Sequence, residues 1–232
     1  MRKLQLTLLV VLLFTALAAT RAIAQPFWEQ AYKGATGVQF TVGSQGIGGE
    51  FKYNFAENAA LRFGASFLPL SANNLFTFSG LKSTNNLSAR FSNVHLIADY
   101  TPFDKAQWFR LVGGLGYLYS ARGAINVIPS GDYKVANYVI TAEELGRLNI
   151  DVSWKGVAPY VGVGLIRNFS LNSRFTANMD LGTYYLASPR STIVGTNLLA
   201  DNYQLQTQMD NNLKSYRWLP VLQLNFSYRI TQ

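Results

Sequence analysis

The sequence contains no cysteine, only one histidine, His95, and no cluster of charges of one sign. Without cysteine the chain cannot form a disulfide, supply a thiolate to a metal or carry the lipid of a lipoprotein. A zinc site of the usual composition is also excluded, because His95 has no second histidine or cysteine beside it. The lysines and arginines are spread singly, so we expect no nucleic acid as a partner. We also expect no cofactor, because the glycines at 43–49 mark a turn between strands and not a phosphate-binding motif.

Long apolar runs are missing after the first segment of the chain. Arg2 and Lys3 precede an apolar run from Leu6 to Ala19, and Ala22-Ile23-Ala24 has the A-x-A form of a cleavage site. We therefore expect residues 1–24 to be a cleaved signal peptide. Beyond it, no stretch reaches the roughly 18 consecutive apolar residues that a transmembrane helix needs. Removing the basic residues of this segment lowers the formal charge from +8 to +5.

The rest of the chain alternates apolar and polar residues with a period of two. In the last stretch one row is Leu222, Leu224, Phe226, Tyr228 and Ile230, and the other is Val221, Gln223, Asn225, Ser227 and Arg229. Seven earlier stretches repeat the pattern, at 36–43, 48–56, 60–68, 93–101, 108–120, 158–167 and 175–186. No amphipathic helices accompany them, so we expect the apolar rows to face lipid. A sheet in hydrocarbon cannot keep an unpaired edge, so the last strand must pair with the first.

The predicted fold is therefore all-β: a closed eight-stranded antiparallel up-and-down transmembrane β-barrel over residues 36–232. A periplasmic lead-in at 25–35 precedes it. Long extracellular loops are expected at 69–92, 121–157 and 187–218, alternating with short periplasmic turns. Within the second loop, the capping-box pattern from Thr141 to Glu144 predicts one turn of helix.

Aromatic residues fall where the two membrane interfaces should lie. Those at the turn ends are Phe55, Tyr100, Trp108, Phe175 and Tyr228, and those at the loop ends are Tyr117, Tyr119, Tyr185 and Trp218. Girdles of this kind are typical of outer-membrane barrels. They disfavour the alternative, a soluble lipocalin-like barrel.

Several strand sequences carry a resemblance to a known group. They are Val42 to Gly48, Ala98 to Phe103, Phe109 to Gly114, Ala158 to Gly164 and Leu219 to Ile230. Here the chain resembles the small eight-stranded outer-membrane β-barrel proteins of Gram-negative bacteria, similar to the OmpA transmembrane domain and the OmpW-like porins. The resemblance implies the cell outer membrane as location. It implies outer-membrane lipids, lipopolysaccharide and the barrel-assembly machinery as partners.

The resemblance has one departure and carries no catalytic motif. Such proteins commonly end in an aromatic residue, whereas Thr231 and Gln232 follow Ile230 here. We therefore expect the insertion signal to be read from Phe226 and Tyr228.

The inward rows contain the candidate site, a structural network of polar side chains in the lumen. Its predicted members are Glu50, Lys52, Arg62, His95, Asp99, Arg110, Asp180 and Arg229. Counted from the short turns, Asp99 should lie between Arg62 and Arg110 and close the lumen. Inward glycines, such as Gly114 and Gly164, either clear a narrow ligand path or relieve crowding in a small barrel.

Three functions follow, in order of preference. The first is a non-enzymatic barrel with a structural, envelope-interaction or narrow transport role. The second is binding or uptake of small hydrophobic molecules, which the OmpW-like resemblance implies and apolar loop residues support: Leu75, Phe76, Phe78, Ile193, Val194, Leu198 and Leu199. The third is a lipid-modifying enzyme or protease using His95 as base, although the H-x-S spacing of a deacylase is missing.

Overall fold

The computed structural model describes residues 33–73, 83–103, 106–135, 138–168 and 174–231. The expected signal peptide at 1–24 and most of the lead-in at 25–35 lie outside these residues. The strands of the barrel are β1 (Thr36–Gly43), β2 (Gly46–Ala56), β3 (Ala59–Asn73), β4 (Ser83–Tyr100), β5 (Phe109–Pro129), β8 (Leu148–Asn168), β9 (Phe175–Tyr185) and β11 (Trp218–Arg229).

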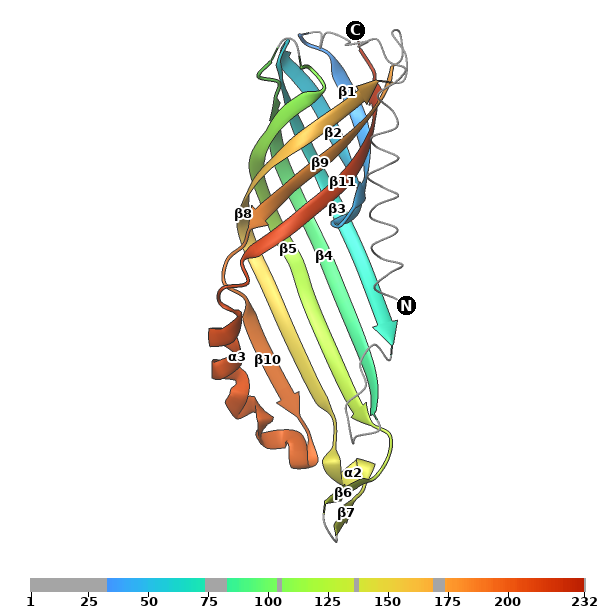
Figure 1. Cartoon of the computed structure of the whole chain (residues 1–232), viewed down its shortest axis with the longest axis vertical. Coiled ribbons are helices and arrows are strands. Elements are labelled where there is room, and N and C mark those ends of the chain that lie inside the picture. Colours follow the sequence, from blue (N-terminus) through green and yellow to red (C-terminus); the bar gives the residue numbers. More distant parts are fainter. Residues whose placement is uncertain (1–32, 74–82, 104–105, 136–137, 169–173, 232) are drawn as a thin grey trace.

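These eight strands pair antiparallel in a closed ring, which Figure 1 shows from the side. The ring closes where predicted, because β11 pairs with β1, with Phe226 opposite Phe40. The closed eight-stranded transmembrane β-barrel is thus confirmed. No helix in the described part of the chain has the length and hydropathy to span a membrane.

The two faces of the barrel wall have opposite chemistry. On the outer face Phe40 is 54% exposed and Phe63 is 60% exposed, whereas inward-facing Thr41 is 1% exposed. A continuous surface of exposed aromatic and aliphatic residues is stable only against hydrocarbon. Every predicted girdle residue is exposed. Two girdle pairs pack with tilted rings whose centroids are 4.9 Å apart, Phe175 with Tyr228 and Tyr185 with Trp218.

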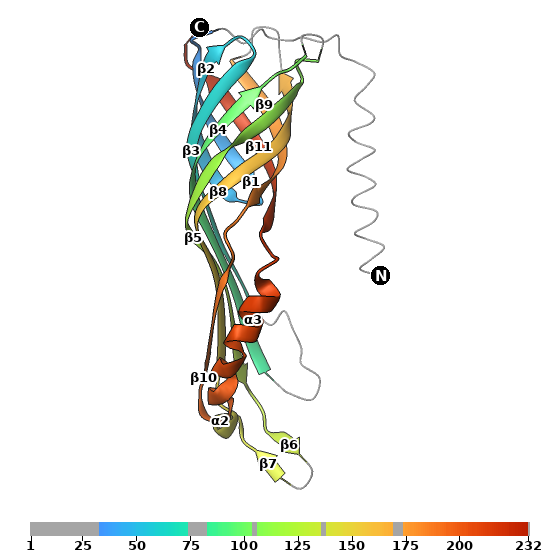
Figure 2. The ribbon, with the colours of Figure 1, turned by 90° about the vertical axis from the view of Figure 1, so that its left-hand side faces the viewer.

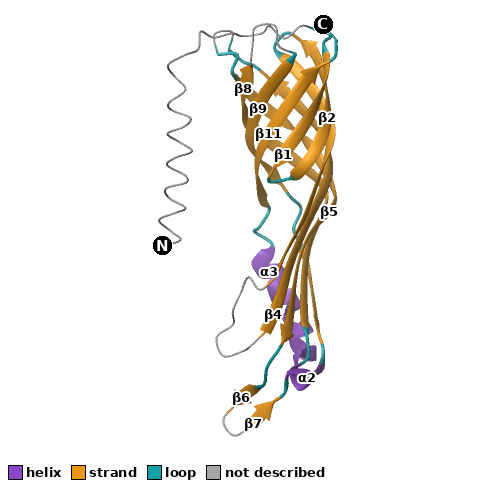
Figure 3. Ribbon diagram, turned by 90° about the vertical axis from the view of Figure 1, so that its right-hand side faces the viewer, coloured by secondary structure: helices purple, strands orange, loops and turns teal. Residues whose placement is uncertain are grey.

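The predicted loops at 69–92 and 121–157 are largely wrong, because four strands continue far beyond the barrel as one curved sheet (Figures 1 and 3). In this extension the alternation persists with inverted polarity. Along β4, Leu87 and Phe91 are on the lumen-side face, while Arg90 is on the outer face. Outside the membrane the outer face meets water and must be polar. The loops were predicted because the outward positions of these strands carry polar residues, which is not the pattern of a lipid-facing strand.

Smaller elements complete the extension. They are the hairpin of β6 (Tyr133–Val135) and β7 (Tyr138–Ile140), α2 (Ala142–Leu145), the edge strand β10 (Arg190–Gly195), the 3-10 helix η2 (Asn197–Leu205) and α3 (Gln206–Leu213). The predicted loop at 187–218 is therefore a strand followed by helices, and Figure 2 shows α3 beside β10. The predicted helical turn is confirmed, because Thr141 and Glu144 form both hydrogen bonds of a capping box at α2.

Asp210 links α3 to β10, the strand that α3 covers, through hydrogen bonds to Ser191. Its Oδ1 accepts hydrogen bonds from the Ser191 backbone N–H at 2.7 Å and from the Ser191 hydroxyl at 2.6 Å. These two bonds to the charged form lower the pKa of Asp210. The open edge of β10 is thereby covered by a helix, as sheet edges in stable proteins usually are.

Candidate functional site: the polar lumen

Asp99 lies between two arginines in the barrel lumen. Its Oδ1 accepts from Arg62 Nη2 at 2.9 Å, and its Oδ2 accepts from Arg110 Nη1 at 2.5 Å. The three side chains come from neighbouring strands, β3, β4 and β5. All are buried: Arg62 is 0% exposed, Arg110 1% and Asp99 4%. Each carboxylate oxygen accepts a hydrogen bond from a guanidinium group, and a charge can be buried only when it is paired and hydrogen-bonded in this way.

The network also crosses the lumen. Arg62 Nη1 is 3.1 Å from Asp180 Oδ2, and Asp180 also forms a salt bridge with Arg110. Around the ring, β3 and β9 are separated by three strands on either side. They are therefore opposite walls of the barrel, and the Arg62–Asp180 pair spans the interior. An eight-stranded barrel is just wide enough for its inward side chains to fill it.

Glu50 is the second carboxylate that Arg62 holds, at 3.0 Å from Nη1 to Oε2. Two amides complete its shell: Gln39 on the neighbouring strand β1 donates to Oε2 at 2.8 Å, and Gln223 on β11, one strand further round the ring, donates to Oε1 at 3.2 Å. His95 Nε2 lies 3.0 Å from Oε1. The charged members of this shell agree with the residues predicted from the sequence, whereas its amides were not predicted.

His95 is fully engaged inside the network. Its Nε2 contacts Glu50 and its Nδ1 lies 2.8 Å from Asn93 Oδ1. The ring is 3% exposed. Both ring nitrogens are thus used in buried hydrogen bonds, and neither of these partners is a serine.

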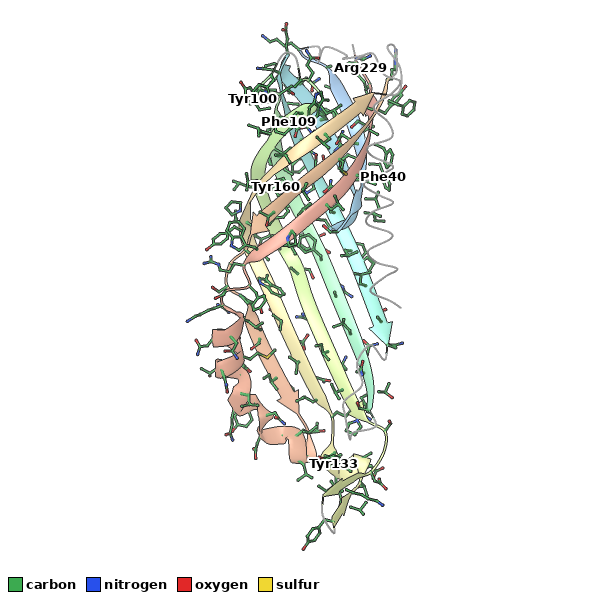
Figure 4. All side chains as sticks on the ribbon, in the orientation of Figure 1. Phe40, Tyr100, Phe109, Tyr133, Tyr160 and Arg229 are labelled. Atoms are coloured by element: carbon green, nitrogen blue, oxygen red, sulfur yellow. The ribbon has the colours of Figure 1, made fainter. Side chains whose placement is uncertain are left out.

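The remaining predicted members, Lys52 and Arg229, lie at the margin. Lys52 is half-buried, stands opposite Arg62 in the register and is within electrostatic reach of Asp99. Arg62, Arg110 and Lys52 then balance Glu50, Asp99 and Asp180 in formal charge. Arg229 is half-buried near the end of the barrel that carries the short turns (Figure 4).

A buried apolar cluster borders the polar network and continues toward the extension, and it was not predicted from the sequence. Tyr160 and Tyr184 pair across β8 and β9 with ring centroids 4.8 Å apart, and Tyr184 is 0% exposed. Figure 4 places Tyr160 in the half of the barrel next to the extension. The buried apolar cluster that contains these tyrosines consists of Phe91, Ile97, Val112, Leu118, Ala121, Ala158, Tyr160, Tyr184, Leu186 and Val221. The apolar residues at inward positions of these strands are the feature of the sequence that could have predicted this cluster.

Inward glycines make room for these large side chains. A Cβ at Gly116 would come within 2.7 Å of Tyr184 Cε1, and one at Gly182 would overlap the Tyr160 hydroxyl. The space beside each glycine is therefore filled by a side chain. Of the two readings of these glycines, relief of crowding agrees with the structure, and a ligand path at these positions does not.

The fold and its filled lumen define the class: an eight-stranded β-barrel of the outer-membrane type. Two solved structures share the fold, both from Acinetobacter baumannii. CarO matches with a TM-score of 0.60 and 21% identity over 87% of this chain and 99% of CarO. CarO2 matches with a TM-score of 0.61 and 18% identity over 84% of this chain and 98% of CarO2. Similarity at this identity establishes the fold alone. No family model and no curated protein matches the sequence.

Proposed function

We propose that this protein is an integral outer-membrane barrel with a closed lumen and a structural or envelope-interaction role. The observation that carries the proposal is the Arg62–Asp180 salt bridge between opposite walls. Asp99 ties the same arginine to Arg110, so the interior is crossed by one connected set of charged pairs. Passive diffusion of solutes would require several buried pairs to separate at once, which costs several kcal/mol for each.

The extension supports the interaction half of the proposal. Strands β3, β4, β5 and β8 continue as a sheet that projects well beyond the lipid-facing belt (Figure 3). A closed barrel that only filled space in the membrane would need no such surface. A barrel that anchors a projecting sheet can present it to lipid headgroups, envelope polymers or other cells.

Planar-bilayer recording tests the closed lumen. Purified wild-type protein should give no steady conductance, while a general porin inserted in the same bilayers provides the positive control. Asp132→Ala, which alters an exposed loop carboxylate, should behave as wild type. Steady conductance of porin size from the wild-type protein would contradict the proposal.

A second candidate function, binding of small hydrophobic molecules, is favoured by a hollow at the far end of the extension. The hollow has a volume of about 710 Å³ and is lined by Tyr138, Val139, Ile140, Glu143, Glu144, Asn197 and Leu198. Tyr138 is 78% exposed and Leu198 63% exposed. Of the other predicted loop residues, Ile193 is 6% exposed on β10, while Leu75, Phe76 and Phe78 lie outside the described residues.

Ligand retention separates the two candidates. Protein soaked with a radiolabelled fatty acid or alkane should retain it saturably if the hollow binds apolar molecules, and Leu198→Asp should abolish this. Leu205→Asp is the matched control, because Leu205 is a similarly exposed leucine of η2 that does not line the hollow. Equal loss in both variants would mean general damage to η2, and no saturable retention would exclude the second candidate.

A lipid-modifying activity remains the third candidate and is tested separately. We expect lipid A to have the same mass in cells that overproduce the protein and in cells that lack it. Any mass change that His95→Gln abolishes would assign catalysis to the lumen, against the first proposal.

A further inference from the structure

A row of basic side chains crosses the outer face of the sheet where the lipid-facing belt ends. On β5, Tyr119 is an exposed aromatic residue of the outer girdle, and Arg122 follows it on the same outer face. Arg90 on β4 is directly opposite Arg122. Lys155 on β8 is exposed on the same face, because inward-facing Trp154 packs against the buried cluster.

These side chains line a groove of about 650 Å³. Its lining residues are Pro69, Leu70, Ser71, Ser88, Ala89, Arg90, Tyr119, Ser120, Ala121, Arg122, Ala124, Asp151, Ser153, Trp154 and Lys155. Three cations and four serine hydroxyls thus converge on one surface with a single acid. This acid, Asp151, is 3.9 Å from Arg122 Nε, and both side chains are well exposed. Such a pair compensates little of the positive charge.

The direct opposition of Arg90 and Arg122 is unfavourable in the protein alone. Like charges at facing positions of an antiparallel pair repel each other and destabilise the sheet. Among the described residues Arg90 has no carboxylate within salt-bridge distance, so the repulsion is not relieved internally. An anion bound between the two guanidinium groups would remove it. Guanidinium groups bind phosphate oxygens through paired hydrogen bonds, and serine hydroxyls donate to the remaining oxygens.

The depth of the groove indicates where such a phosphate comes from. Arg122 is three residues beyond Tyr119, which is the extra residue of a β-bulge, so the two are about 8 Å apart along the strand and about 6 Å along the membrane normal at a typical barrel tilt. The polar headgroup layer beyond the hydrocarbon is roughly 5–8 Å thick on each side. The arginines therefore lie at headgroup depth, on the face that continues the lipid-facing wall.

We propose that the groove formed by Arg90, Arg122 and Lys155 binds the phosphate groups of an anionic glycolipid of the outer leaflet, of the lipopolysaccharide class. The acyl chains of this lipid pack against the aromatic belt below Tyr119. This inference rests on the proposed location in the outer membrane and is independent of whether the lumen conducts. It gives the barrel a defined lipid partner at the base of its projecting sheet.

The test measures lipid retained by purified protein in detergent after incubation with lipopolysaccharide, counted by native mass spectrometry. The double variant Arg90→Gln/Arg122→Gln should bind roughly thirtyfold more weakly than wild type, since each basic residue near an anionic lipid surface contributes on the order of 1 kcal/mol and about 1.4 kcal/mol corresponds to a tenfold change. The matched control is Lys134→Gln/Arg147→Gln, which removes two exposed cations at the far end of the extension, outside the groove, and should bind as wild type.

Two further arms identify the ligand chemistry. Lipopolysaccharide whose lipid A phosphates have been removed should bind wild type as weakly as the intact lipid binds the double variant. Inorganic phosphate at millimolar concentration should not displace the intact lipid. Displacement would assign the groove to a soluble phosphate, and equal binding by wild type and double variant would exclude the groove as a lipid site.

The outcome is separable from that of the proposed function. Folding of each variant is checked by its heat-modifiable mobility on gels, because a misfolded barrel would also lose lipid. If wild type and a folded double variant both show no steady conductance in planar bilayers, and the double variant alone loses the lipid, the closed lumen and the lipid site are both supported. A wild-type protein that conducts but binds lipid through the two arginines overturns only the closed lumen.

Discussion

Gly164 faces Arg110 across the β5–β8 pair and faces Asp180 across the β8–β9 pair. A Cβ at Gly164 would overlap the Arg110 side chain and come within 2.8 Å of Asp180 Oδ1. The absence of a side chain at Gly164 is therefore a condition for the Arg110–Asp180 salt bridge. The network depends as much on where the barrel wall lacks side chains as on where it has them.

Substitution of this glycine should show the dependence. Gly164→Ala should lower the free energy of unfolding by about 1–3 kcal/mol, the usual cost of inserting atoms into a filled interior. Urea unfolding in detergent micelles, followed by tryptophan fluorescence, measures the change. Gly123→Ala is the matched control, because a Cβ there meets nothing within 4 Å. Equal destabilisation by both would mean that strand geometry, and not the lumen contact, is responsible.

The membrane-spanning part of the fold could be predicted because contact with hydrocarbon requires an apolar residue at nearly every outward position of a strand. The alternation predicted a strand over residues 36–43, and β1 spans Thr36–Gly43. Ring closure by β11 on β1 followed from the need to pair every backbone group in lipid. The position of Asp99 between Arg62 and Arg110 followed from counting along neighbouring strands. Each of these inferences used only local period and strand adjacency.

The features that were missed depend on other physical conditions. Beyond the membrane the outer face meets water, so the pattern of β4 inverts at Arg90 and no longer identifies a lipid-facing strand. The contact of Arg62 with Asp180 joins opposite walls, and adjacency along the sheet contains no information about it. The packing of Tyr160 on Tyr184 joins neighbouring strands, but it depends on the register between β8 and β9, which the period of the sequence alone does not give.

The helix that covers β10 should loosen in acid. Because the pKa of Asp210 is lowered by its bonds to Ser191, its contribution is fully present above the ordinary aspartate pKa of about 3.9. It is lost as the pH falls from there through the lower folded-state pKa. Hydrogen exchange of the Ser191 amide, corrected for intrinsic rates, should therefore quicken below about pH 4. In Asp210→Asn the exchange should not change across this window, and an identical acid response would contradict the assignment.

Protease added to intact cells should cut the far end of the extension. Lys134 on β6 is exposed there, and Lys214 after α3 is exposed nearer the barrel, so trypsin should cleave at both sites without permeabilisation. Arg174 lies at the start of β9, at the opposite end of the barrel, and should be cut only after the outer membrane is opened. Cleavage at Arg174 in intact cells, with Lys134 protected, would reverse the orientation.

Removing the carboxylate between the two arginines should be costly. Asp99→Ala leaves Arg62 and Arg110 facing each other in the lumen, with only Glu50 and Asp180 to compensate them. Breaking a buried pair by deleting one partner typically costs about 3–5 kcal/mol. The loss should appear as a lower unfolding midpoint in urea.

Asp99→Asn separates charge from shape in this prediction, because it keeps the volume and one acceptor oxygen but removes the negative charge. If the charge is what holds the two arginines, Asp99→Asn should lose most of the stability that Asp99→Ala loses. Asp132→Ala, which removes an exposed carboxylate outside the barrel, should unfold as wild type. An Asp99→Ala protein of unchanged stability would mean that water, and not the carboxylate, compensates Arg62 and Arg110. The interior would then be a hydrated path instead of a closed network.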